Sequence, residues 1–307
     1  MIWSPSFFLA QNPIQSEGTF LFDILAQNIP AAGTFQNYII AAILALLQAI
    51  IINVMVSKYR ITEEITLLPG LFYLLFMGFS TEFWTVNPIL IANFFLLLAI
   101  IELVATYKEY SSADRIYNIG IAIGLASLCY FSYFVFLVFA WIGIGILRAI
   151  RWKERLILII GFLSPYFLVA TYKYWHGQLY EFISQEILEN FQLLSFAKDQ
   201  NINDFITAGL IFLVLIVSIF SYKLYTYKKK IKIQKIIDIL YWVMAASVLS
   251  IIFHKQINVQ HFQMLLPILA IFASINFVTM SRQWSETLHL LLLASILIWH
   301  YIPVLNI

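Results

Sequence analysis

The chain has 307 residues, of which 62% are hydrophobic and only 11% carry a charged side chain. Its mean hydropathy of +0.87 leaves too little polar surface to cover a water-soluble globule. The composition therefore excludes a soluble enzyme or binding domain, and it predicts one all-α transmembrane domain over residues 1–307. Because the net charge is only +2, the positions of the charges are more informative than their sum.

Residues 1–36 are predicted to form an outer segment that precedes the first membrane span. The first ten residues are too few to cross a bilayer, and they lack the basic start of a signal peptide. Phe20 and Ile24 follow helical spacing, while Pro30 and Gly33 would end the helix. We therefore expect a short surface helix in this segment.

Ten apolar stretches follow, each close to the roughly 20 residues that a helix needs to cross a bilayer. Only Tyr130, Phe131 and Ser132 are available for the turn between the fourth and fifth, so a short re-entrant pair or a broken helix is an alternative there. The spans are expected near residues 37–57, 65–80, 87–107, 116–131, 133–148, 155–175, 205–224, 236–254, 260–280 and 286–303.

Lysine and arginine are distributed unevenly between the two sides that ten crossings define. One side has only Lys173, Lys198 and Lys255, so 15 of the 18 basic residues lie on the other. The densest basic segments are the turn over residues 148–155 and the loop over residues 223–235. Because basic loops stay on the cytoplasmic side, the pattern predicts that both termini face outward.

The longest predicted outer segment, residues 176–204, has the pattern of an amphipathic helix that lies on the membrane surface. Its polar face is acidic and would not attract anionic lipid, so burial of the apolar face would hold it there. The apolar residues that recur at helical spacing are Leu179, Phe182, Ile183, Ile187, Phe191 and Leu194.

Two carboxylates of the N-terminal segment, Glu17 and Asp23, are the candidate catalytic residues. They precede the first span beside the expected surface helix, where a partly apolar setting would tune a carboxylate to act as a general base. The alternatives are a solvated loop carboxylate for either residue and a helix N-cap for Asp23.

Several polar side chains lie inside predicted spans. Glu102 in the third span is costly in hydrocarbon, and we expect it to reach the interface or to pair with a basic residue of the 148–155 turn. Gln48 and Asn53 in the first span, and Asn93 in the third, have the chemistry to hydrogen-bond between helices or to line a polar path.

His254, Lys255 and His261 form a candidate site for a lipid phosphate on the outer side, with interfacial anchoring as the alternative. No histidine pair has the spacing of a metal motif, so neither a metal nor a cofactor is expected. The single Cys129 excludes an intrachain disulfide. The 223–235 loop is basic enough to attract anionic headgroups, but no fold signature supports nucleic-acid binding.

Three segments resemble a family of polytopic membrane proteins of unknown function from Bacteroidota. They are LLQAIIINVMVSKYRITEEITLLPGLFYLLFM over residues 46–77, RAIRWKERLILIIGFLSPYF over 148–167 and LLPILAIFASINF over 265–277. This resemblance covers most of the chain, and it implies a bacterial inner-membrane location but no known activity.

A second, fainter resemblance is to the C-superfamily glycosyltransferases, which move sugars from polyprenyl-phosphate carriers on the outer face. Their first outer loop has an Asp-Glu pair followed by a small residue and an aromatic residue, where this chain has Ser16, Glu17, Gly18 and Phe20. Ser16 replaces the Asp of the pair. The resemblance implies a glycosyltransferase-like core, active or degenerate, with a polyprenyl-phosphate-linked sugar as partner.

Two functions therefore stand open from the sequence. The first is the handling of a lipid-linked saccharide on the outer face, with Glu17 as the base and Asp23 in support. The second is a non-catalytic membrane subunit or scaffold of a cell-envelope assembly, which would hold a protein partner through its acidic outer helix and lipid-facing surface.

Overall fold

The computed structural model describes residues 18–62, 64–109, 112–148, 151–184, 202–252 and 258–280, together with positions 283, 287, 290 and 294. This part of the chain is 83% helical and contains no β-strand. The prediction of an all-α protein is therefore confirmed.

Twelve α-helices and several short 3-10 helices are found along the described residues. The α-helices are α1 (Phe20–Ala26), α2 (Phe35–Tyr59), α3 (Leu68–Phe76), α4 (Pro88–Ala105), α5 (Ala113–Cys129), α6 (Val135–Leu147), α7 (Trp152–Trp175), α8 (Leu179–Glu181), α9 (Ile202–Phe220), α10 (Tyr222–Thr226), α11 (Ile231–Ile252) and α12 (Leu266–Thr279). The 3-10 helices used below are η2 (Met77–Phe79), η3 (Thr81–Trp84), η4 (Phe131–Phe134) and η6 (Val259–Met264).

Four of these helices, α2, α4, α7 and α11, are long and apolar enough to cross a membrane. Shorter apolar helices occupy residues 68–79, 131–147, 205–220 and 266–279. These apolar helices indicate a membrane-embedded protein. The prediction of about ten crossings is finer than this finding, and it stays a prediction.

Local signals in the sequence explain where the long helices begin. The Thr34 side chain accepts a hydrogen bond from the Asn37 backbone N–H at 3.3 Å and caps α2. Asn87 caps α4 in the same way, with its Oδ1 atom 2.7 Å from the Leu90 nitrogen, and Pro88 follows at the first helical position.

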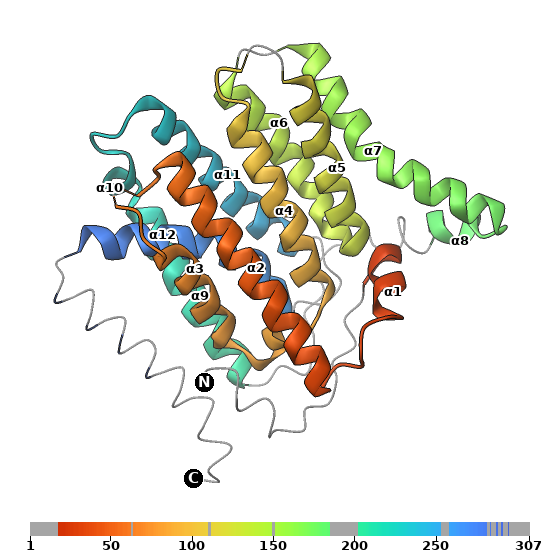
Figure 1. Ribbon diagram of the computed structural model, residues 1–307, viewed down its shortest axis with the longest axis horizontal. Coiled ribbons are helices and arrows are strands. Elements are labelled where there is room, and N and C mark those ends of the chain that lie inside the picture. The colour runs from red at the N-terminus through yellow and green to blue at the C-terminus, as the bar shows by residue number, and fades with distance from the viewer. Residues whose placement is uncertain are drawn as a thin grey trace, which may run out of the picture.

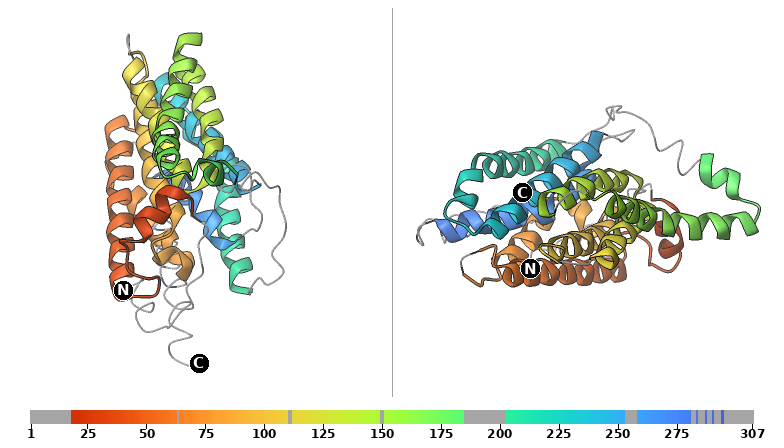
Figure 2. Two further views of the ribbon diagram at one scale, coloured as in Figure 1. Left: turned by 90° about the vertical axis from the view of Figure 1, so that its right-hand side faces the viewer. Right: turned by 90° about the horizontal axis from the view of Figure 1, so that it is seen from above.

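The helices pack in two layers. Figure 1 shows α2, α4 and α5 next to one another, with α7 beyond α5, and each neighbouring pair is in contact. Helices α9, α11 and α12 form the second layer in Figure 2, where α6 packs against α11 and α3 packs against α12. The C-terminal half of α7 projects beyond the other helices.

One end of the bundle collects the loops that follow α2, α4 and α6 and the loop that precedes α11. The Lys232 ammonium of α11 lies 5.2 Å from the ring of Tyr59 and 5.7 Å from the ring of Tyr107, so three of these loops meet. Arg148, in the loop after α6, donates a hydrogen bond to the hydroxyl of Ser112, in the loop between α4 and α5. The loop after α6 therefore meets the other three at this end. We call this the basic end.

Helices α5 and α7 approach closely because glycines face one another across their contact. A Cβ atom on Gly161 would lie 2.4 Å from the Tyr117 carbonyl oxygen, and one on Gly120 would lie 2.4 Å from the Leu158 carbonyl oxygen. Backbone therefore packs on backbone here. Beside this contact the hydroxyls of Tyr117 and Ser164 are 2.9 Å apart.

The predicted fourth and fifth spans are two separate helices, α5 and α6, joined by η4. The junction is buried, and the Ser250 hydroxyl of α11 donates to the Ser132 carbonyl at 3.1 Å. Cys129, the last residue of α5, is a buried free thiol. Of the predicted amphipathic segment 176–204, the structure describes α8 and the residues up to 184, and residues 202–204, which begin α9. Residues 185–201 lie outside the described residues.

Candidate functional site at the end of helix α7

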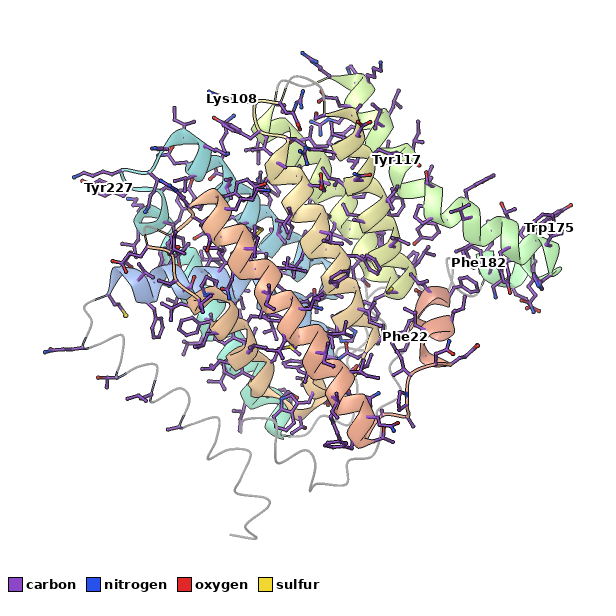
Figure 3. All side chains as sticks on the ribbon, in the orientation of Figure 1. Phe22, Lys108, Tyr117, Trp175, Phe182 and Tyr227 are labelled. Atoms are coloured by element: carbon purple, nitrogen blue, oxygen red, sulfur yellow. The ribbon has the colours of Figure 1, made fainter. Side chains whose placement is uncertain are left out.

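Helix α1 is attached to the end of α5 that lies away from the basic end. The Thr19 backbone N–H donates to the Cys129 carbonyl at 3.2 Å, and its hydroxyl donates to the Leu128 carbonyl. Phe22, labelled in Figure 3, is buried against this end. Capping the last carbonyls of α5 in this way satisfies groups that a helix C-terminus leaves unpaired.

A cluster of aromatic rings and one lysine joins α1 to the C-terminal part of α7. The ring centroid of Phe20 lies 6.2 Å from that of Tyr172 and 6.2 Å from that of Phe182, which is only 2% exposed. The Lys173 ammonium lies 4.7 Å from the Phe20 ring, within the range of a cation–π interaction. The His176 ring lies 4.4 Å from the Tyr172 ring, tilted by 35°. We call this group the α1–α7 cluster.

Asp23 lies on the exposed side of α1, within electrostatic reach of this cluster. Partial burial raises the pKa of the Asp23 carboxyl above its ordinary value, and the positive charge of Lys173 opposes part of the rise. A carboxyl with a raised pKa beside a lysine and aromatic rings has the chemistry of a proton acceptor. Glu17, the other predicted catalytic residue, lies outside the described residues.

The predicted phosphate-binding residues are only partly described, because His254 and Lys255 lie outside the described residues. His261 belongs to η6, which precedes the apolar helix α12. It is 6% exposed, and its Nδ1 atom accepts a hydrogen bond from the Asn258 backbone N–H at 2.8 Å. Its phosphate-binding role stays a prediction.

Helix η6 and the start of α1 both contact the turn at the end of α5. The His261 ring lies 5.9 Å from the ring of Tyr130, and Tyr130 follows directly on Cys129, whose carbonyl is bonded to Thr19. The fold therefore brings two segments, far apart in the sequence, to the end of α5. This proximity could not be read from the spacing of the residues.

The polar residues inside predicted spans bind helices to one another. Gln48 accepts a hydrogen bond from the Tyr73 hydroxyl and donates to the Leu90 carbonyl at 2.7 Å. Asn53 accepts from the Gly70 backbone N–H at 2.7 Å. These bonds join α2 to α3 and α4, which agrees with the packing interpretation of Gln48 and Asn53.

A second buried network lies between α4, η4 and η6. The Asn93 side chain accepts from the Tyr133 hydroxyl at 2.7 Å and donates to the Gln263 carbonyl at 2.9 Å. Neither Tyr73 nor Tyr133 was predicted from the sequence to join helices. The signal that could have found them is the hydroxyl itself, because a tyrosine in an apolar run needs a hydrogen-bond partner when it is buried.

Glu102 pairs with Arg115, which was not its predicted partner. Its carboxylate lies 3.0 Å from Arg115, which also binds Glu109 at 2.7 Å. The 148–155 turn was expected to supply the partner, but within the described residues Arg148 of this turn pairs instead with Glu154 at 3.2 Å. The short loop after α4 places the first turn of α5 beside Glu102. The partner is thus corrected to Arg115, and the pairing agrees with the structural interpretation of Glu102.

Arg155 was counted among the loop residues, yet it is only 3% exposed. Its guanidinium centre lies 5.2 Å from the ring of Trp141 on α6, and its Nε and one terminal nitrogen have no hydrogen-bond partner in the described part of the chain. A stacked guanidinium of this kind holds the first turn of α7 against α6.

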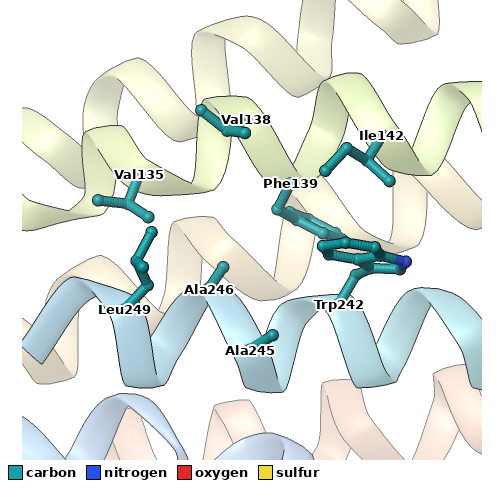
Figure 4. Close-up of a pocket in the computed structure, with 8 residues that line it drawn as sticks. All are labelled: Val135, Val138, Phe139, Ile142, Trp242, Ala245, Ala246 and Leu249. Carbon is teal, nitrogen blue, oxygen red and sulfur yellow. The ribbon is translucent and has the colours of Figure 1, made fainter.

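An apolar pocket between α6 and α11 is shown in Figure 4. Its volume of about 130 Å³ is small, and no charged residue is among those that line it. Such a pocket suits part of an acyl chain and not a saccharide. The lining residues are Val135, Val138, Phe139, Ile142, Trp242, Ala245, Ala246 and Leu249.

Among the residues that the structure describes, no group of histidine, cysteine or carboxylate side chains could hold a metal ion. In comparisons with known proteins, no family model matches this chain, and no curated protein or solved structure is similar to it. The two family resemblances noted from the sequence therefore stay predictions, and the geometry at the end of α7 is the basis for a functional proposal.

Proposed function

We propose that this chain is a multi-pass protein of a bacterial inner membrane that handles a lipid-linked saccharide at the end of α7. The observation that carries the proposal is the position of Asp23, whose raised pKa and neighbouring Lys173 suit proton transfer next to an anionic carrier. In this proposal the basic end is cytoplasmic, both termini are periplasmic, and about ten segments cross the bilayer.

Each part of the α1–α7 cluster has a chemical role in the proposal. The Lys173 ammonium would attract the phosphate of a polyprenyl-phosphate-linked sugar, and the rings of Phe20 and Tyr172 would contact the sugar. The Asp23 carboxylate would accept the proton of an acceptor hydroxyl. The bond from that oxygen to the sugar carbon forms, while the bond from the sugar carbon to the phosphate oxygen breaks and leaves polyprenyl phosphate with the electron pair.

The test is native purification in mild detergent, followed by mass spectrometry of the lipids that stay bound. We expect the wild type and Asp23→Asn to retain a polyprenyl-phosphate sugar, and Lys173→Gln to lose it. In reconstituted vesicles, Asp23→Asn should fail to consume the bound lipid, whereas Glu17→Gln tests the other predicted base. Asp114→Asn removes a charge from the first turn of α5 and is the control.

Two results would refute the proposal. The first is that no polyprenyl-linked lipid is retained by the wild type. The second is that Asp23→Asn and Glu17→Gln both consume the carrier lipid at the wild-type rate. Neither predicted carboxylate would then be the catalytic base.

A second candidate function is supported by the exposed part of α7. Trp175 is 84% exposed and Phe167 is 71% exposed, on a segment that projects beyond the bundle (Figure 2). We propose as the alternative that this segment binds an apolar helix of another envelope protein, which makes the chain a non-catalytic subunit. One stoichiometric partner that is lost in Phe167→Ser, with no carrier lipid bound, would favour this function over the first.

A further inference from the structure

The basic end contains a group of lysines that converge on two tyrosine rings. The Lys232 ammonium lies 5.2 Å from the Tyr59 ring and 5.7 Å from the Tyr107 ring, and the Lys235 ammonium lies 5.8 Å from the Tyr107 ring. Lys58 and Lys108 each lie 5.7 Å from the ring of the adjacent tyrosine. We call these six residues the lysine–tyrosine cluster. It joins the ends of α2 and α4 to the start of α11.

The charges around this cluster do not balance. Among the described residues, Glu102 and Glu109 act on the Tyr59 side of the cluster and share the single positive charge of Arg115, which leaves one net negative charge against four lysines. The four ammonium groups gather around the same two rings, so their like charges repel one another. An anion among the ammonium groups would remove this repulsion.

The start of α11 shows the same imbalance. Its first turn contains Lys232 and no acidic residue. A helix N-terminus carries a partial positive charge and favours an anion, so a lysine there is opposed by the helix dipole. The helix is 22 residues long, and its first backbone N–H groups lie next to the lysine–tyrosine cluster.

A separate observation also points to a bound group. Tyr59 is only 8% exposed, yet its hydroxyl has no hydrogen-bond partner among the described residues. Buried hydroxyls are normally paired, because an unpaired one loses its bonds to water without replacement. The charged side chains that act on this hydroxyl are those of Arg115, Glu102 and Glu109, so the unpaired donor lies beside the lysines that contact the Tyr59 ring.

We propose that the lysine–tyrosine cluster binds the phosphate group of an anionic membrane lipid. The ammonium groups and the start of α11 supply the positive charge, and the ends of three apolar helices place this charge where lipid headgroups lie. A soluble phosphate has the same chemistry but no acyl chains to follow the helices. The site lies at the opposite end of the bundle from the α1–α7 cluster, so the two proposals can fail independently.

The experiment compares two double variants of the purified full-length chain. Lys232→Gln with Lys235→Gln removes two charges from the cluster, whereas Lys223→Gln with Lys228→Gln removes two from α10 and the loop after it and is the control. Native mass spectrometry measures the retention of added phosphatidylglycerol, with phosphatidylcholine as the neutral lipid. Thermal unfolding is recorded with and without phosphatidylglycerol, and inorganic phosphate is added in a separate arm.

We expect the cluster variant to bind phosphatidylglycerol about tenfold or more weakly than the control, from the contribution of two lysines near a membrane surface. Its stability without lipid should equal or exceed that of the wild type, because a lysine is removed from a helix N-terminus. The stabilisation by phosphatidylglycerol should be lost.

Three outcomes would overturn the proposal. Equal weakening in the two double variants would show diffuse attraction by the whole basic end. Unchanged retention of phosphatidylglycerol by the cluster variant would show that these lysines do not bind the lipid. Stabilisation by inorganic phosphate as large as that by phosphatidylglycerol would assign the site to a soluble anion.

Discussion

Replacement of Gly161 by alanine should separate α5 from α7. The added Cβ would lie 2.4 Å from the Tyr117 carbonyl oxygen and 3.2 Å from the Gly120 Cα atom, whereas ordinary contact begins at 3.4 Å. The obstacle is backbone, which cannot rotate away as a side chain can. The two helices must therefore separate by about 1 Å at this point, enough to forfeit a quarter to a half of the dispersion energy of atoms in contact.

The size of the effect follows from overpacking in a close-packed interior, which costs about 1 to 3 kcal/mol. We expect Gly161→Ala to fall in the upper half of this range, because the α5–α7 contact is extensive and no flexible atom can yield. Gly209→Ala is the matched control, since a Cβ atom there would have nothing within 4 Å. This control should be neutral or stabilising by up to about 1 kcal/mol through helix propensity.

The assay is reversible unfolding of both variants in mixed micelles, followed by tryptophan fluorescence. A difference of about 2 kcal/mol or more between Gly209→Ala and Gly161→Ala is the expected result. If the two variants were equally stable, the close approach of α5 and α7 would not be a source of stability, and the reasoning from backbone contact would be refuted.

Three further predictions concern single side chains. Asn93→Leu should cost about 1 to 3 kcal/mol in the same unfolding assay, because the buried Tyr133 hydroxyl loses its 2.7 Å acceptor and keeps only the longer bond of 3.4 Å to the Ile89 carbonyl; a wild-type value would contradict this. Glu102→Gln should change stability by less than about 1 kcal/mol, since Glu102 and Arg115 are partly exposed, and a larger loss would mean a stronger ion pair. For Asp23, burial raises the pKa, so the folded state binds the proton more tightly than the unfolded state and ionisation opposes folding. Asp23→Asn should therefore be at least as stable as the wild type at pH 7. Thermal unfolding should show that this difference in stability disappears near pH 4, where the aspartate of the unfolded chain is protonated.

The positions of the helices could be predicted from composition because a long apolar run has few alternatives to a helix. Residues 37–57 and 87–107 were predicted as spans, and α2 and α4 occupy both segments. The capping residues Thr34 and Asn87 are local signals of the same kind. Within the described residues, four helices are long and apolar enough to be candidate spans, and the prediction of about ten crossings stays a prediction.

Contacts between helices could not be predicted, because they depend on the faces that tertiary packing selects. The partner of Glu102 was expected in the 148–155 turn, but the return of the chain after α4 places Arg115 beside it. The link between Asp23 and Lys173 joins residues 150 positions apart, and nothing in either segment indicates the other. Tyr133 looked like one aromatic residue among many until its hydroxyl was placed on Asn93.

Because the thiol of Cys129 is buried, the wild-type chain offers no accessible cysteine to a labelling reagent. Cys129 is the only cysteine in the sequence and is fully shielded, so an impermeant maleimide should leave the wild type unmodified. A single Lys230→Cys or Asp23→Cys substitution would then supply the sole reactive thiol at one end of the bundle. Labelling of sealed vesicles of known orientation would report which compartment each end faces, residue by residue, without any further change to the protein.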